Sequence, residues 1–330
     1  LSGQIAALST LALTFIARPL GAILFGHFGD RFGRKNTFVI SLLVMGVSTM
    51  VIGLLPTYDS IGIWATLLLC LCRIGQGIGL GGEWGGAALV AIENAPEGKR
   101  GWYGTFPQLG APLGLLLANG AFLLITDILG SAAMTDWAWR IPFLSSSILV
   151  VIGLYVRLKL AEAPIFVTAL DKPQPKTLPM VEVIITHFKP FFLGMLICIA
   201  GYVLFYIIIA FSQIYAKSAP SQSEAGYAMG LGFSPQIFTA LLMYSAVSLA
   251  ISITISGKCI DKIGRRIWLI WTTVAVAIFG LALPYFLENG TTVSLFWFLI
   301  IGMGLIGMGY GPLSSFLPEL FPTHVRYTNG

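Results

Sequence analysis

Nine apolar stretches, each long enough to cross a lipid bilayer as a helix, follow one another along this sequence. A crossing helix needs about 20 predominantly apolar residues, and the stretches lie near residues 2–25, 37–56, 61–92, 103–126, 141–158, 190–215, 235–256, 267–286 and 293–318. With 56% hydrophobic and 10% charged residues and a mean hydropathy of +0.86, the chain cannot cover the surface of a water-soluble globule. The composition predicts an all-α membrane protein and excludes a disordered chain, a coiled coil and a disulfide-stapled secreted domain.

The basic residues predict which side of the membrane each loop faces. Fifteen of the 19 Lys and Arg residues, Arg157 among them, fall in one set of inter-helix loops, whereas the opposite set holds Arg140 and Lys217. Because cytoplasmic loops are the ones enriched in Lys and Arg, we place the basic set in the cytoplasm. Such loops report topology, so the net charge of +5 does not indicate a nucleic-acid partner.

Two short motifs occur twice, in the same order along the chain. Residues 26–35 and 257–266 share the pattern G-x-x-x-D-[RK]-x-G-R-[RK], and residues 93–100 and 319–326 share the pattern E-x-x-P-x-x-x-R. All four copies fall on the predicted cytoplasmic side. Parallel internal repeats are a known way to build membrane transporters, so we expect two related halves.

The first pattern resembles the signature loop of the major facilitator superfamily. Four further segments resemble its metabolite:proton symporter branch, which includes shikimate, α-ketoglutarate and proline/betaine permeases: RPLG at 18–21, GGEWGG at 81–86, WRIPF at 139–143 and PELFP at 318–322. The resemblance covers essentially the whole chain. It implies the major facilitator fold, two parallel six-helix repeats, of which about nine transmembrane helices (2–10) are present in a chain truncated at both ends. It also implies a monomer in the bacterial inner membrane.

This resemblance also predicts the domain organisation. Residues 1–158 are expected to form the N-terminal half with helices 2–6, residues 159–189 a central cytoplasmic loop, and residues 190–330 the C-terminal half with helices 7–10. Because incomplete halves would leave packing faces against lipid, we expect residues 1–330 alone not to transport a solute.

The charged residues of the duplicated motifs predict a cytoplasmic gate. Asp30 and Asp261 are placed to cap a helix N-terminus or to pair with an arginine, and Glu93 and Glu319 end apolar spans beside basic loops. The hypothesis is that these charges hold the two halves together when the site opens outward, and the alternative is that they are solvated and set only the topology. The predicted gate residues are Asp30, Arg31, Arg34, Glu93, Arg100, Asp261, Arg265, Glu319 and Arg326.

Three ionisable residues fall inside predicted spans, namely Arg18, Arg73 and Glu83. A charge at membrane depth costs about 2.5–3.5 kcal/mol or more, so such residues are functional candidates. At a helical period, Arg73, Gln76 and Glu83 share an arc of about 80°, and the glycines between residues 75 and 86 cover the other side. The polar arc predicts a wet cavity. A structural hydrogen bond to a neighbouring helix remains the alternative for Glu83, and Arg18 is expected to be structural, beside Pro19.

In related proton-coupled symporters, an arginine at the place of Arg73 pairs with an acid on the first helix, so we expect the main proton-binding acid to lie outside this chain. Glu83 is the second candidate. The remaining polar residues expected along a substrate or proton pathway are Gln108, Asn119, Tyr202, Tyr206 and Gln213. Tyr202, Tyr206 and Gln213 are spaced to share one helix face, although such a stripe more often packs than binds. Residues 77–82 also fit the dinucleotide pattern G-x-G-x-x-G, but inside an apolar span we expect them to serve helix packing.

These observations predict a secondary transporter that moves a small polar metabolite, a carboxylate or a zwitterion, together with protons by alternating access. The alternatives are a proton-independent facilitator, a drug or metabolite antiporter of the same fold, and a solute receptor that does not transport. An enzyme is not expected, because the three His residues lie in different loops and no nucleophile–base pair or phosphate loop occurs. The four scattered cysteines indicate no metal site, and no cofactor is expected.

Overall fold

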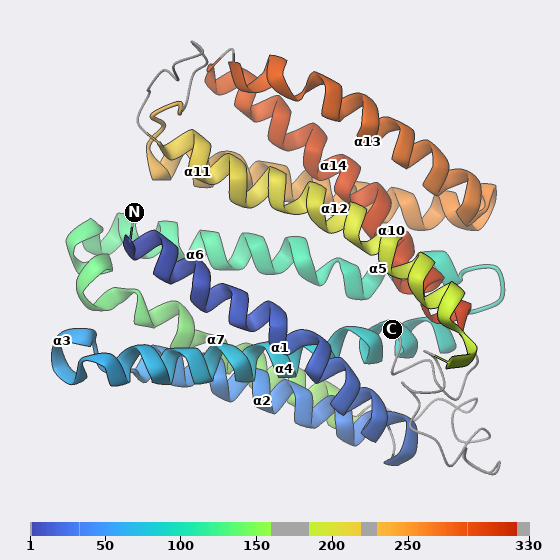
Figure 1. The fold of residues 1–330 in the computed structure, drawn as a ribbon, viewed down its shortest axis with the longest axis horizontal. Coiled ribbons are helices and arrows are strands. Elements are labelled where there is room, and N and C mark those ends of the chain that lie inside the picture. The colour runs from blue at the N-terminus through green and yellow to red at the C-terminus, as the bar shows by residue number, and fades with distance from the viewer. Residues whose placement is uncertain (1, 33, 160–184, 219–229, 289, 322–330) are drawn as a thin grey trace. The chain divides into compact units, whose positions relative to one another are not determined.

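The structure is a computed structural model that describes the chain except residues 1, 33, 160–184, 219–229, 289 and 322–330; for residues 2–8, 30–32 and 34 it describes the backbone alone. The described part is helical and contains no strand (Figure 1). Its elements, in order, are α1(Ser2–Phe32), α2(Arg34–Leu54), α3(Tyr58–Ile61), α4(Ile63–Glu93), α5(Arg100–Gln108), α6(Gly110–Ala133), η1(Met134–Ala138), α7(Arg140–Lys159), α10(Phe188–Tyr206), η2(Ile207–Phe211), α11(Ser212–Lys217), α12(Pro235–Ile263), α13(Arg265–Glu288), α14(Thr292–Phe316) and η3(Pro318–Leu320).

Nine helical stretches of the described chain are long and apolar enough to cross a membrane. They are Ser9–Gly29, Lys35–Leu54, Ile63–Glu93, Arg100–Ala138, Arg140–Lys159, Phe188–Lys217, Pro235–Ile263, Arg265–Glu288 and Thr292–Leu320. Each overlaps one of the nine apolar stretches of the sequence, so the predicted number of spans is confirmed. Large apolar side chains such as Leu281 and Trp271 are exposed on these helices, as expected where the solvent is lipid.

The chain forms two compact units. Unit 1 comprises residues 1–94, 125–191 and 317–330, and unit 2 comprises residues 95–124 and 192–316. Residues 95–124 thus pack with helices of the predicted C-terminal half. The predicted division into two halves, residues 1–158 and 190–330, rests on the sequence repeat. The two compact units do not test that repeat, so the division stays a prediction.

Unit 1 is built around two helix pairs. Helices α1 and α4 run parallel and approach so closely that a side chain on Gly77 or Gly81 would collide with the α1 backbone at Thr14 and Arg18. Small residues let membrane helices approach in this way. The segment 77–82 therefore serves helix packing, as predicted from its place inside an apolar span. Helices α2 and α7 form the second pair, which is antiparallel.

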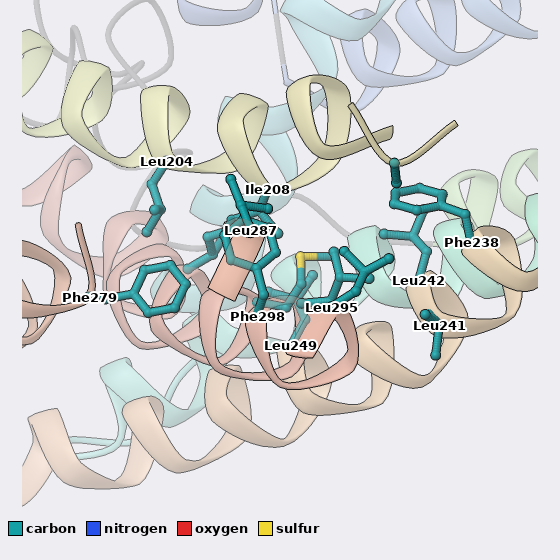
Figure 2. Close-up of a cluster of buried hydrophobic side chains, with 14 of the residues drawn as sticks. Leu204, Ile208, Phe238, Leu241, Leu242, Leu249, Phe279, Leu287, Leu295 and Phe298 are labelled. Atoms are coloured by element: carbon teal, nitrogen blue, oxygen red, sulfur yellow. The ribbon is translucent and has the colours of Figure 1, made fainter. Parts of the chain in front are cut away.

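Unit 2 holds the largest buried apolar cluster. Ile208 of η2, Phe279 of α13 and Phe298 of α14 belong to it, and the rings of Phe279 and Phe298 stack with centroids 5.7 Å apart (Figure 2). Helices α12 and α14 pack side by side along a seam of small residues. Ser252 and Ser256 of α12 face Gly307 and Gly311 of α14 along this seam.

The turn between α12 and α13 lies within the second copy of the first motif. Gly264 ends α12 with a φ of 91°, a left-handed conformation that glycine adopts at low cost. The glycine of the G-R-[RK] part of the motif therefore permits the sharp reversal between the two helices. The equivalent Gly33 lies outside the described residues.

Candidate functional site

The polar arc predicted on α4 begins with a hydrogen-bonded chain that reaches α2. Nη1 of Arg73 donates to Oε1 of Gln76 at 3.1 Å, and Nε2 of Gln76 donates to Oγ1 of Thr49 at 2.8 Å. Both α4 residues are half-buried. Because a bilayer offers no water to polar groups, side chains at this depth have to bond to one another. Gln76 thereby orients the guanidinium of Arg73 from one side.

Spare hydrogen-bonding capacity lies on the α1 side of α4. Among the described atoms, Nε of Arg73, Nε of Arg18 and Oγ1 of Thr14 are buried and have no hydrogen-bond partner. Arg18 lies over the ring of Phe15, with its guanidinium carbon 4.6 Å from the ring centroid. Buried polar groups are normally paired, so unpaired donors on two arginines are what a site for an anionic group requires.

Glu83 does not join this chain of bonds, although it shares the arc. Its Oε1 forms an ion pair with Nη2 of Arg157 on α7. The structure therefore places Glu83 in a contact between helices, which was the structural alternative from the sequence. Its place on a proton pathway stays a prediction.

Arg157 is the residue that the sequence analysis missed, because it was counted among the loop residues that set the topology. The structure places it in the last turn of α7, with its side chain 11% exposed. A signal was available: an acid inside a membrane span needs a cation, and Arg157 ends an apolar helix from which a long side chain can reach inward.

Two of the other predicted pathway residues make structural bonds. Gln108 is 1% exposed, and its Nε2 donates to the carbonyl oxygen of Tyr310 at 3.0 Å. Asn119 donates to the carbonyl oxygen of Leu115 in its own helix at 2.8 Å. A role of either side chain toward a solute stays a prediction.

Tyr202 and Tyr206 line an open, mainly apolar hollow of about 580 Å³ on α10, η2 and α11, together with Ile207, Phe211 and Ile214. Gln213 is not among the lining residues. The π-helical turn η2 lies between Tyr206 and Gln213, and its wider turn changes the angle between positions that an uninterrupted α-helix would align. That all three residues share one face stays a prediction.

One predicted gate residue makes the kind of contact that the sequence suggested. The carboxylate of Asp261 accepts hydrogen bonds from the backbone N–H groups of Gly101, at 2.8 Å, and Trp102, at 2.9 Å. These N–H groups belong to the first turn of α5, where the helix dipole favours an anion. Nearby, Lys258 lies 4.8 Å from the centroid of the Trp102 ring, and Arg265 interacts electrostatically with both Asp261 and Arg100.

The remaining gate residues are less defined. Glu93 ends α4 and Glu319 lies in η3, and both are half-buried. The side chains of Asp30, Arg31 and Arg34, and all of Arg326, lie outside the described residues. Their part in a gate stays a prediction.

Comparison with known proteins decides what this helical framework is. The family model described as "Major Facilitator Superfamily" matches residues 2–329. The chain belongs to this family. It is a multi-pass membrane transporter, and the resemblance carried by the duplicated loop motifs is confirmed.

The relatives agree with this assignment. A relative named for metabolite transport in Haemophilus influenzae is 87% identical over 328 residues, which cover 99% of this chain and 73% of the relative. The inner membrane metabolite transport protein YhjE of Escherichia coli K12 is 46% identical over 97% of this chain and 72% of its own length. The solved structure of the proton:xylose symporter XylE superimposes with a TM-score of 0.77 at 18% identity, covering 98% of this chain and 75% of that one. That likeness shows the same all-helical fold.

Proposed function

We propose that the protein is a secondary active transporter that carries a small polar metabolite, a carboxylate or a zwitterion, together with protons across the bacterial inner membrane. The observation that carries this proposal is Arg73. Its guanidinium lies half-buried within the apolar span of α4, is held on one side by Gln76, and keeps an unpaired Nε donor.

The chemistry of Arg73 favours an anionic group on the solute. A guanidinium presents its donors in a planar fork that matches a carboxylate, and a charge-assisted hydrogen bond is about twice as strong as a neutral one. Thr14 adds a buried hydroxyl on the facing helix α1. A solute carboxylate bound here would offset part of the cost of holding an arginine at membrane depth.

The names of relatives support the same class of solute. A proline/betaine transporter of Escherichia coli K12 is 33% identical over 337 residues, and a shikimate transporter of the same organism is 31% identical over 333 residues. Proline and betaine are zwitterions and shikimate is a carboxylate. The proposal that transport is coupled to protons is suggested by the proton:xylose symporter, which has the same fold.

Alternating access needs a contact that holds one side shut, and Asp261 provides a candidate. Asp261 lies on α12 and caps the N-terminus of α5. The repeat assigns α5 to the N-terminal half (residues 1–158) and α12 to the C-terminal half (residues 190–330). We infer that this contact closes the cytoplasmic side in the described conformation. The basic loops lie in the cytoplasm in this proposal, and the protein works as a monomer.

The proposal is tested by solute uptake into proteoliposomes that hold the protein expressed from its complete gene. Labelled proline, betaine, shikimate and α-ketoglutarate are offered with and without an imposed proton gradient, acidic outside. Accumulation of one of them above the equilibrium level, and only with the gradient, is expected. If the solute only equilibrates across the membrane and the gradient has no effect, the protein is a facilitator. If a proton gradient of the opposite direction accelerates uptake, it is an antiporter. If the solute binds but is not taken up, the protein is a receptor.

A further inference from the structure

Arg157 joins three membrane-spanning helices of unit 1. Besides its ion pair with Glu83 of α4, its Nη1 donates to the carbonyl oxygen of Phe38 on α2 at 2.8 Å. Its guanidinium carbon also lies 3.7 Å from the centroid of the Phe38 ring. One face of the guanidinium lies on the Phe38 ring, both Nη groups have partners, and little of the side chain is exposed, so Arg157 is held in a single orientation.

Helices α2 and α7 are joined a second time, at their other ends. Nη2 of Arg140 donates to the carbonyl oxygen of Leu55 at 3.2 Å. The two arginines are 17 residues apart on α7, and the two carbonyl groups are 17 residues apart along α2. Between them, Gly46 faces Val150 in the same antiparallel register. The α2–α7 pair is therefore a frame clamped at both ends.

The two clamps differ in what else they touch. Arg140 lies against the ring of its neighbour Trp139, with the guanidinium carbon 4.6 Å from the ring centroid, whereas Arg157 reaches across to α4 through Glu83. Glu83 lies ten residues, about 15 Å, along α4 from Arg73. Together with the bond from Gln76 to Thr49, the ion pair attaches α4 to the frame at two separate depths.

We propose that Arg157 is a positioning residue, which fixes α4 and its solute-binding side chains Arg73 and Gln76 against the α2–α7 frame by pairing with Glu83. In this role Glu83 is a fixed anion and does not carry the transported proton. The inference rests on the proposed transport function, because the side chains that it positions are those proposed to bind the solute.

The contacts of Arg157 support a fixed anion. The Phe38 carbonyl and ring hold the guanidinium in place from α2, independently of Glu83. A proton arriving at Glu83 would therefore leave a buried positive charge beside a neutral acid, and breaking a buried pair by removing one charge is strongly unfavourable. A proton carrier needs a counter-charge that can move away, and Arg157 is anchored.

Transport kinetics of three variants and one control test the proposal in proteoliposomes containing the protein from its complete gene. Glu83→Gln and Arg157→Gln are each expected to raise the KM for uptake about tenfold, since small displacements of binding groups weaken their contacts. The double variant is expected to recover part of the loss of Arg157→Gln, because no unpaired carboxylate remains. Arg140→Gln removes the clamp that does not reach α4, and its KM is expected to stay within about twofold of the original.

Two results would overturn the inference. One is an unchanged KM for uptake by the Glu83→Gln protein. This measurement tests the positioning role even if the Arg157→Gln protein fails to reach the membrane. The other is a Glu83→Gln protein that still exchanges labelled solute across the membrane but no longer accumulates it with a proton gradient, because that pattern identifies a proton carrier.

A second measurement is independent of transport. Cys70 and Cys72 lie on α4 near Arg73, so their rate of modification by a maleimide reports the position of this helix once Cys198 and Cys259 are replaced by serine. Arg157→Gln is expected to change this rate at least about threefold and Arg140→Gln to leave it unchanged. Equal rates in all proteins would contradict the positioning role. A protein that moves no solute at all would contradict only the proposed function.

Discussion

The helix pairs α1–α4 and α12–α14 hold equivalent places in the sequence repeat, yet they differ in charge at membrane depth. When the copies of the first motif are aligned, Arg18 of α1 stands where α12 has Leu249. When the copies of the second motif are aligned, Arg73 and Glu83 of α4 stand where α14 has Leu299 and Gly309. The first pair thus carries Arg18, Arg73 and Glu83 at positions where the second pair carries apolar residues or glycine.

The two pairs also pack through different atoms. Gly77 and Gly81 of α4 face backbone atoms of α1. On α14, Gly311 faces the hydroxyl group of Ser256 first, and Gly307 faces both the hydroxyl group of Ser252 and the backbone carbonyl of Leu249. A hydroxyl can rotate away from an added methyl group, and a backbone carbonyl cannot. One copy of the scaffold therefore carries the charges that we propose act on a polar solute, while the other has apolar residues or glycine in their place.

Making α4 like α14 at its first charged position is expected to have the largest effect. Arg73→Leu copies Leu299 and removes the guanidinium proposed to bind the solute, so the initial rate of uptake should fall about 100-fold, as for the loss of a key donor in a site of low dielectric. The rate is measured in proteoliposomes and normalised to the amount of folded protein. Arg73→Lys keeps the charge without the planar fork, and its rate should lie between the two.

If the Arg73→Leu protein transports as fast as the original, the difference in charge between the two copies has no role in transport. Folding is not expected to confound the result, because replacing a half-buried arginine by leucine removes a charge from the membrane interior.

A comparison of two glycine substitutions sharpens the packing difference. Gly81→Ala would press a methyl group against the backbone of Arg18, and it is expected to lower the free energy of unfolding by about 2 kcal/mol. Gly311→Ala meets the Ser256 hydroxyl first, and its cost is expected to be below about 1 kcal/mol. Unfolding in detergent micelles, followed by near-UV circular dichroism during heating, ranks the two. The reverse order would show that the α12–α14 seam is the less adaptable one.

The fold was open to prediction from the sequence because a membrane restricts the possibilities. Once nine stretches exceed the thickness of the bilayer, helices are the only way to satisfy their backbones, and duplicated loop motifs then fix the order of the helices. The packing role of Gly77 and Gly81 followed from their place within an apolar span.

The site was only partly predictable, because a helical period describes one helix and not its neighbours. It grouped Arg73 with Gln76 correctly, since both lie on α4 and bond to each other. It could not say that Glu83 turns toward Arg157, whose long side chain reaches inward from the end of another helix. For Gln213, the period itself changed, because the π-helical turn η2 interrupts the α-helix before that residue.

The smallest effect is expected at Asp261, a predicted gate residue of the second copy. Asp261→Asn keeps the side-chain shape but removes the negative charge that accepts from the N–H groups of Gly101 and Trp102. A hydrogen bond to a charged group contributes about 1.5–3 kcal/mol, of which an amide retains a part. The balance between closed and open states of the cytoplasmic side should therefore shift about tenfold toward open.

A cysteine behind the contact reports this shift. Thr105 of α5 is 1% exposed, so Thr105→Cys in a protein whose four native cysteines are replaced by serine should react slowly with an impermeant maleimide added from the cytoplasmic side of inside-out vesicles. Adding Asp261→Asn should raise the rate about tenfold. Lys262→Gln changes the neighbouring charge by one unit in the opposite direction, and it should leave the rate unchanged. If Lys262→Gln lowers the rate by as large a factor as Asp261→Asn raises it, the loop acts through its overall charge, and Asp261 then sets the topology and does not serve as a gate.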